Sequence, residues 1–119
     1  MTTNELLYTV MLKTEPKTNS LFVRDQRIDL ALQEVTGFHP DELQSKDRRF
    51  ELTEPRQIGM FFYVKAGYTY NQSGLRFHRD HATVVNAKHK IEAYYSQKWE
   101  KRLTELIDLM SRKTGISIN

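Results

Sequence analysis

Residues 69–91 read TYNQSGLRFHRDHATVVNAKHKI, and this stretch decides the fold that we expect for the chain. Thr69 is a good N-cap, and Gln72 follows three residues later, which gives the T-x-x-Q form of a capping box. A helix should therefore begin near Tyr70. Its apolar rhythm ends after Phe77, where polar residues take over.

A second helix is predicted directly after this break. Val84, Ala87 and Ile91 stand at the three- and four-residue spacing of a helix face that packs on a core. The helix should begin near Asp80. Two helices joined by a short polar turn, the second opening on hydrogen-bonding side chains, are typical of a helix-turn-helix. In that motif the second helix presents its N-terminal residues to base edges in the major groove of DNA.

The rest of the chain predicts further helices and no clear pair of strands, so the expected fold class is all-α. Apolar residues recur at helical spacing in residues 4–13, 24–36 and 54–66, and Pro40 opens a single helical turn between the last two. Large aromatic side chains are the usual fillers of small helical cores. The core positions predicted in residues 54–66 are Ile58, Phe61, Phe62 and Tyr63.

The C-terminal part continues the helical pattern from Asp80 to Met110 almost without a break. An unbroken helix of about thirty residues would be about 45 Å long, more than a compact domain of this size needs. We therefore expect a turn near residues 95–98, with Ser96 as the N-cap of a last helix that folds back onto the core. The alternative is a tail helix that pairs with a second subunit, which would make the protein a homodimer.

Length and composition restrict the class of protein. At 119 residues the chain is most simply one domain, residues 1–119, with no cysteine for disulfides, thiolate catalysis or structural zinc. Its four histidines include no pair at the spacing of H-E-x-x-H, so we expect neither a metal site nor an enzyme. The motif G-x-x-x-x-G-K-[ST] is missing, and no cofactor is expected. The longest apolar run, residues 60–64, is far short of the ~18 residues that cross a bilayer, so we expect a cytoplasmic protein without a membrane partner.

Positive charge is concentrated around the predicted helix-turn-helix. The chain has a net charge of +3, from 18 Lys and Arg against 15 Asp and Glu. Residues 44–90 hold nine of the basic and four of the acidic residues, a net charge of +5, which leaves −2 for the remainder. Such a distribution fits a protein that neutralises DNA phosphates, and it equally fits a solvated surface that happens to be basic.

Five short pieces of the sequence together resemble a known family. They are LQSKDRR at 43–49, PRQI at 55–58, GYT at 67–69, RDHATV at 79–84 and KIE at 90–92. In this order they resemble the C-terminal DNA-binding domain of the bacterial chromosomal replication initiator DnaA. The resemblance covers about residues 28–92, so residues 93–119 would be a C-terminal helical extension.

That resemblance implies a Trp-repressor-like helical domain that binds double-stranded DNA at short, partly A·T-rich sites. It places Arg48 in the minor groove. Asp80 and His81 fall on positions that read bases in the major groove. Arg56 and Gln57 fall on positions that contact the DNA backbone and nearby bases. With the polar neighbours that suit phosphate contacts, the predicted DNA-binding set is Arg48, Arg56, Gln57, Lys65, Thr69, Asn71, Arg79, Asp80, His81, Ala82, Thr83 and Lys88.

The sequence departs from the family pattern GGRDHTTV in ways that bear on the target site. His78 precedes Arg79 in a turn that is one residue shorter. Ala82 replaces the first threonine, which removes a hydroxyl donor but keeps a methyl group for contact with thymine. Asn71 stands where the family usually has proline, and Asp47 replaces a basic residue of the loop. We therefore expect a target sequence different from the usual initiator box.

Three alternatives stay open at the level of sequence. Asp80 can cap the helix that it begins, accept a hydrogen bond from a cytosine amino group, or do both. The DNA-binding role can be replication-initiator-like or regulatory. A function of a different class, a protein-interaction module, would use an apolar C-terminal surface made of Tyr94, Tyr95, Trp99, Leu103 and Leu106.

Overall fold

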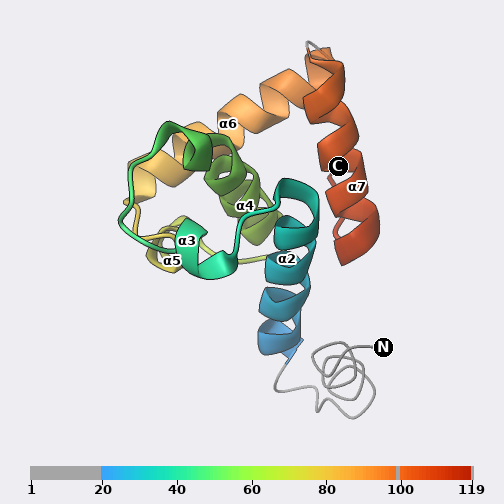
Figure 1. The fold of residues 1–119 in the computed structure, drawn as a ribbon. Helices are drawn as coiled ribbons and strands as arrows, with labels where there is room; N and C mark the ends of the chain where they lie inside the picture. The colour runs from blue at the N-terminus through green and yellow to red at the C-terminus, as the bar shows by residue number, and fades with distance from the viewer. Residues whose placement is uncertain (1–19, 99, 119) are drawn as a thin grey trace.

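The computed structural model describes residues 20–98 and 100–118, with side chains from Asp25 onward (Figure 1). The predicted helix at residues 4–13 lies outside the described residues. The described part is all-α, as predicted, and contains no strand. Its elements are α2 (Ser20–Thr36), α3 (Pro40–Leu43), the 3-10 turn η2 (Phe50–Leu52), α4 (Thr53–Lys65), α5 (Tyr70–Arg76), α6 (His81–Gln97) and α7 (Lys101–Thr114).

The predicted helix boundaries are confirmed to within a few residues. α2 begins at Ser20, earlier than the predicted start at residue 24. The prediction began too late because the apolar residues at 21–23 are consecutive and show no helical spacing. α4 begins and ends one residue before the predicted range of 54–66. The single turn at Pro40 is present as α3. The 3-10 turn η2 has no counterpart in the prediction.

α4 is the central helix, and it contacts α2, α5 and α6 (Figure 1). Its four predicted core residues are all buried, and Met60 joins them. The ring of Phe61 packs edge-on against that of Phe62, with 5.3 Å between the centroids, and Tyr63 packs in the same way on Phe77 at 5.6 Å. The contact between Tyr63 and Phe77 connects α4 to the turn of the helix-turn-helix, so the core also positions that motif.

The C-terminal helix folds back, as the turn prediction requires. α6 ends where Lys98 adopts a left-handed conformation, with φ of 53°, and α7 begins after Glu100. The expectation that Ser96 caps α7 was wrong. Ser96 lies inside the last turn of α6, where its hydroxyl donates to the carbonyl of Ala93 at 3.5 Å.

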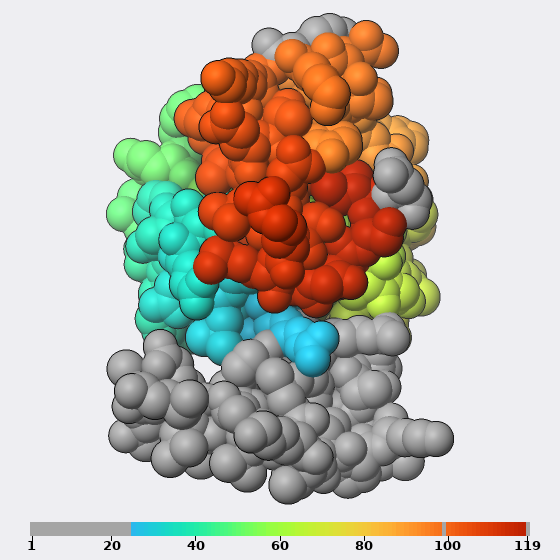
Figure 2. Space-filling view, turned by 90° about the vertical axis from the view of Figure 1, so that its right-hand side faces the viewer, coloured from blue at the N-terminus to red at the C-terminus, as the bar shows by residue number. Residues whose placement is uncertain are grey.

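α7 packs along α2, and the two surfaces meet on the face shown in Figure 2. Leu103, Ile107 and Met110 of α7 are buried in the common core. At the edge of this contact Lys113 pairs with Glu34 of α2 at 2.6 Å. The apolar side of the C-terminal helix is therefore occupied within the chain.

A polar network fixes α5 against α2 and α4. The hydroxyl of Tyr63 donates to Asp29 at 2.7 Å, and Nε of Arg76 donates to the same hydroxyl oxygen at 3.1 Å. Arg76 also forms an ion pair with Asp29. Burial raises the pKa of Tyr63, and the nearby Asp29 carboxylate raises it further, so Tyr63 stays a neutral donor. One side chain from each of three helices thus sets the position of α5.

The turn between α5 and α6 depends on a close backbone approach at Gly74. The amide of Arg79 donates to the carbonyl of Gly74 at 2.8 Å. A Cβ atom at Gly74 would come nearer to the carbonyl oxygen of Arg79 than the 3.0 Å that real Cβ atoms keep. His78 between them has φ of 54°, in the left-handed region. The motif is therefore closed by a turn that has no room for a side chain at residue 74.

Replacing Gly74 with alanine should lower the free energy of unfolding by about 1–3 kcal/mol, because the added methyl group overpacks the turn. Urea unfolding followed by circular dichroism measures this change. The neighbouring Leu75 is 76% exposed, so Leu75→Ala is a matched control and should cost less than about 0.5 kcal/mol. A Gly74→Ala protein as stable as the wild type would contradict the close approach.

Candidate nucleic-acid interface

The first turn of α6 projects from the surface. Asp80 is its N-cap, and one carboxylate oxygen accepts from the Thr83 amide at 2.8 Å. Hydrogen bonds from the Thr83 side chain and backbone lower the pKa of Asp80, so its carboxylate is ionised at neutral pH. His81, Ala82 and Thr83 are all exposed. Of the two roles open for Asp80, the structure contains the cap, while base reading stays a prediction.

Six of the predicted residues meet around one surface hollow. The hollow lies between residues 45–49, which we call the basic loop, the start of α4 and the start of α6. The predicted residues that line it, which we call the loop-side group, are Arg48, Arg56, Gln57, Arg79, Asp80 and Thr83. Segments that are more than thirty residues apart in the sequence therefore form a single concave surface.

Arg56 lies at the bottom of this hollow, and its side chain binds the backbone of α3 and of the basic loop. Its side chain is only 3% exposed. Nε donates to the carbonyl of Leu43 at 2.8 Å, and Nη2 donates to the carbonyls of Glu42 and Ser45 at 3.1 and 3.2 Å. Burial lowers the pKa of Arg56, and the nearby Arg79 lowers it further. Arg56 was predicted as a DNA contact, but its donors are largely engaged by the backbone of α3 and the basic loop.

Arg79 joins the basic loop to the turn of the helix-turn-helix. Nη1 donates to the carbonyls of Phe77 and His78 at 3.1 and 3.0 Å. Nη2 reaches the carbonyl of Asp47 in the basic loop at 3.3 Å. One guanidinium group thus bridges two segments that both belong to the predicted interface.

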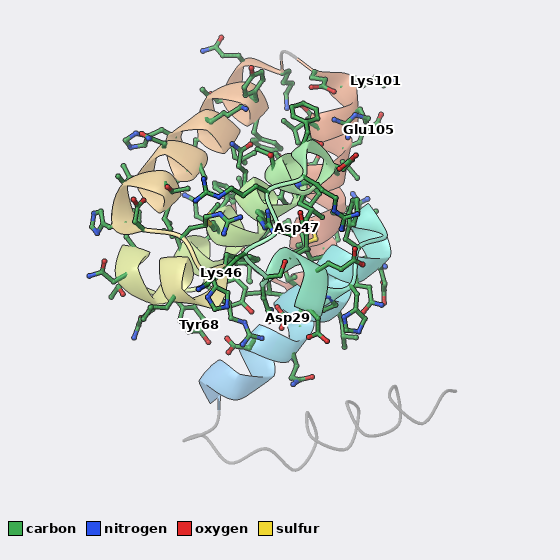
Figure 3. All side chains as sticks on the ribbon, turned by 60° about the vertical axis from the view of Figure 1, so that its left-hand side comes forward. Asp29, Lys46, Asp47, Tyr68, Lys101 and Glu105 are labelled. Atoms are coloured by element: carbon green, nitrogen blue, oxygen red, sulfur yellow. The ribbon has the colours of Figure 1, made fainter. Side chains whose placement is uncertain are left out.

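The basic loop is also braced from within. The Asp47 carboxylate accepts from the amide of Arg49 at 2.9 Å and from its Nε at 2.8 Å. The hydrogen bond from the Arg49 amide is the main cause that lowers the pKa of Asp47. Arg49 also pairs with Glu42 at 3.1 Å. Lys46 and Asp47 lie where the loop crosses in front of α4 (Figure 3). Asp47, the acidic residue of the basic loop, therefore stabilises the conformation of that loop.

Arg48 differs from the other arginines of the region. It is exposed at the rim of the hollow. Within the described residues its guanidinium forms no hydrogen bond or ion pair, whereas Arg49, Arg56 and Arg79 all do. Arg48, like the exposed Lys46 beside it, is thus left without an acidic partner among the described residues, on a loop that Asp47 and Arg49 brace.

The other predicted residues lie around the N-terminus of α5. We call this set, which consists of Lys65, Thr69, Asn71, His81 and Lys88, the α5-side group. Nδ1 of His81 lies 3.3 Å from Oδ1 of Asn71, and the His81 ring meets the edge of Tyr70 with 5.2 Å between centroids. The hydroxyl of Thr69 accepts from the amide of Gln72 at 3.0 Å, which confirms the predicted capping box.

The two groups flank opposite sides of the first turns of α6. At 100° per residue, His81 and Lys88 share one flank of the helix, and Thr83 lies on the other. Ala82 lies between the flanks, farthest from the buried face that contains Val84. A helix that enters a groove with Ala82 foremost would therefore have polar side chains on both walls.

Glu92 is a residue of this region that was not predicted. Its carboxylate oxygen lies 3.3 Å from Nζ of Lys65 and 3.1 Å from Nζ of Lys88. Lys88 and Glu92 are four residues apart on α6, so the i, i+4 rule could have suggested that pair. The contact with Lys65 of α4 depends on tertiary packing and leaves no local signal.

The described part of the chain holds neither a metal-binding cluster nor a membrane-spanning helix. Its histidines and acidic residues form no group of three or more that could hold a metal ion. None of its helices is long and apolar enough to cross a bilayer.

Comparison with known families agrees with this geometry. The family model described as the bacterial dnaA protein helix-turn-helix matches residues 26–91, which is more than half of the chain. No curated protein matches the sequence. The matched span includes the basic loop, all of α5, α6 as far as Ile91, and every residue around the hollow. That family is a DNA-binding one with no catalytic role. The chain therefore belongs to the bacterial DnaA helix-turn-helix family, the C-terminal DNA-binding domain of DnaA.

Proposed function

We propose that this chain recognises a short duplex site as a single domain, with the first turn of α6 in the major groove and Arg48 in the neighbouring minor groove. The observation that supports this most directly is the bridge made by Arg79. It connects the basic loop to the turn that aims α6. An exposed arginine and an exposed helix N-terminus are thereby held at a fixed separation, as the reading of two adjacent grooves requires.

The side chains at the tip of α6 suit base recognition. His81 can donate to a base oxygen or lie against a thymine methyl group, and the methyl of Ala82 can make a similar apolar contact. The Thr83 hydroxyl can donate or accept. The Asp80 carboxylate, which accepts from the Thr83 amide as the helix cap, can also accept from a cytosine amino group. On the loop side, the narrow minor groove of A·T-rich DNA attracts an arginine such as Arg48.

The remaining predicted residues would position the protein on the DNA backbone. Lys65, Lys88, Thr69 and Asn71 lie on the α5 side, where they can reach phosphates of one strand. Gln57 lines the hollow on the loop side. Arg56 would act by supporting the basic loop, because its donors bond backbone carbonyls. The protein can serve replication initiation or regulation, since both need only occupancy of a specific site.

The alternative of a protein-interaction module is less well supported. Its proposed surface included Leu103, which is 4% exposed and belongs to the core. The hydroxyl of Tyr95 donates to Asp108 of α7 at 2.6 Å, so it too is used within the chain. A homodimer through the C-terminal helix would need the same side chains for its interface. Dimerisation stays a prediction that gel filtration can test.

Selection from a randomised duplex pool at two salt concentrations tests the proposed function. We expect enrichment of one short sequence and an affinity that falls steeply as salt rises, because bound lysines and arginines release counterions. A pool that stays random at both salt concentrations would refute site-specific binding.

Replacing Arg48 with alanine should weaken binding to the selected duplex at least tenfold, because the minor-groove contact is lost. Fluorescence anisotropy with a labelled duplex measures the affinity. Arg112→Ala removes the same charge from an exposed position on α7 and should change the affinity less than twofold. Equal losses for the two variants would show that Arg48 contributes only general charge.

His81→Ala should cost ~1–3 kcal/mol on the selected duplex and relax the preference at one base pair. Lys88→Ala should instead weaken binding to the selected duplex and to its single-base variants by the same factor, because a phosphate contact carries no sequence information. Parallel titrations with the selected duplex and its single-base variants separate the two effects. If both altered proteins lose the same factor on every duplex, His81 does not read a base.

A further inference from the structure

The contact between Glu92 and two predicted phosphate-binding lysines has no obvious place in a DNA-binding surface. A carboxylate near bound phosphates repels them, so an acid at this position should weaken binding to any DNA. Yet Glu92 of α6 lies within 3.3 Å of both Lys65, from α4, and Lys88, from its own helix. The three groups together carry one net positive charge instead of two.

Both lysines are held by more than this one carboxylate. Nζ of Lys65 also lies over the ring of Phe61, 5.6 Å from its centroid. Lys88 interacts with the Tyr70 hydroxyl as well as with Glu92. The side chains of Lys65 and Lys88 are only 23% and 22% exposed. Neither ammonium group is therefore free to follow a phosphate over a wide range of positions.

This restraint acts differently on specific and non-specific binding. When α6 occupies the groove in its specific register, phosphates near the α5-side group take fixed places, and lysines already held in position lose little further entropy. In non-specific complexes the phosphates take many positions, and electrostatic contact supplies essentially all of the affinity. A lysine held by Glu92 must then break its ion pair to reach them.

We propose that Glu92 is a selectivity residue: by holding Lys65 and Lys88 in one place, it suppresses binding to random duplex DNA more than binding to the target site. This inference rests on the proposed function, because it needs a preferred duplex. It names a positioning role for a residue that does not itself contact DNA. Without this role, the Glu92 carboxylate would only stabilise the contact between α4 and α6.

The variant Glu92→Gln tests the proposal, since glutamine keeps the size of the side chain and removes its charge. The affinity for random duplex should rise about threefold to tenfold, in line with the loss of two partly exposed ion pairs. The slope of its salt dependence should steepen by roughly one. The affinity for the selected duplex should change less than twofold, so the selectivity ratio should fall. Anisotropy titrations with both duplexes at several salt concentrations measure all three quantities.

Two controls make the outcome decisive. Glu34→Gln removes the same charge from another lysine pair, Glu34 with Lys113 across α2 and α7, and should leave the selectivity ratio unchanged. In the double variant Lys65→Met, Lys88→Met, the further change Glu92→Gln should leave the selectivity ratio unchanged, because repulsion by the carboxylate acts on both duplexes alike. A ratio that still falls without the lysines would show that Glu92 acts independently of them and would overturn the proposal.

Three outcomes separate the role of Glu92 from the recognition of a specific site. A wild-type protein that prefers its selected duplex, combined with a Glu92→Gln variant of equal selectivity, overturns only the role of Glu92. If Glu92→Gln unfolds at lower urea concentration while its selectivity ratio is unchanged, Glu92 only stabilises the fold. A wild-type protein without any duplex preference overturns both proposals.

Discussion

The hydrogen bonds that Arg56 and Arg79 donate to backbone carbonyls are the contacts on which the rest of the interface depends. Arg56 engages carbonyls on α3 and at the start of the basic loop, and Arg79 engages the loop and the turn before α6. Charged donors make stronger hydrogen bonds than neutral ones, and a buried carbonyl left without its donor costs about 1–3 kcal/mol. Because a loop without regular structure is otherwise free to move, these two side chains decide where Arg48 lies relative to α6.

This arrangement changes how the charge of the sequence should be interpreted. Residues 44–90 carry a net charge of +5, but four of their nine cations form ion pairs. Arg49 pairs with Asp47, Arg76 with Asp29, and Lys65 and Lys88 share Glu92. The exposed cations without an acidic partner among the described residues include Lys46 and Arg48 of the basic loop. A surface of this kind favours one orientation on DNA, whereas evenly spread lysines would bind in many orientations.

Local rules predicted most of the fold, and they failed where long-range packing decides. The capping box at Thr69, the buried face of α6 and the aromatic core of α4 all follow from spacings within one helix, and all are present. Arg56 was predicted as a DNA contact from the family resemblance, but α3 and the basic loop fold over it and accept its hydrogen bonds. The bridges from Arg79 to Asp47 and from Lys65 to Glu92 join segments distant in sequence. A single sequence carries no signal for such contacts.

In the proposed complex the basic loop and α6 face the same duplex, while α7 faces away from it. The chain has no cysteine, so a single cysteine at Lys46 or at Glu105 can hold an iron chelate that cleaves nearby DNA. The two side chains lie on the loop and on α7, respectively (Figure 3). The chelate at position 46 should cleave within a few base pairs at one end of the selected site, and the chelate at position 105 should not cleave the DNA. Cleavage from position 105, or cleavage from position 46 spread evenly along the duplex, would contradict this arrangement.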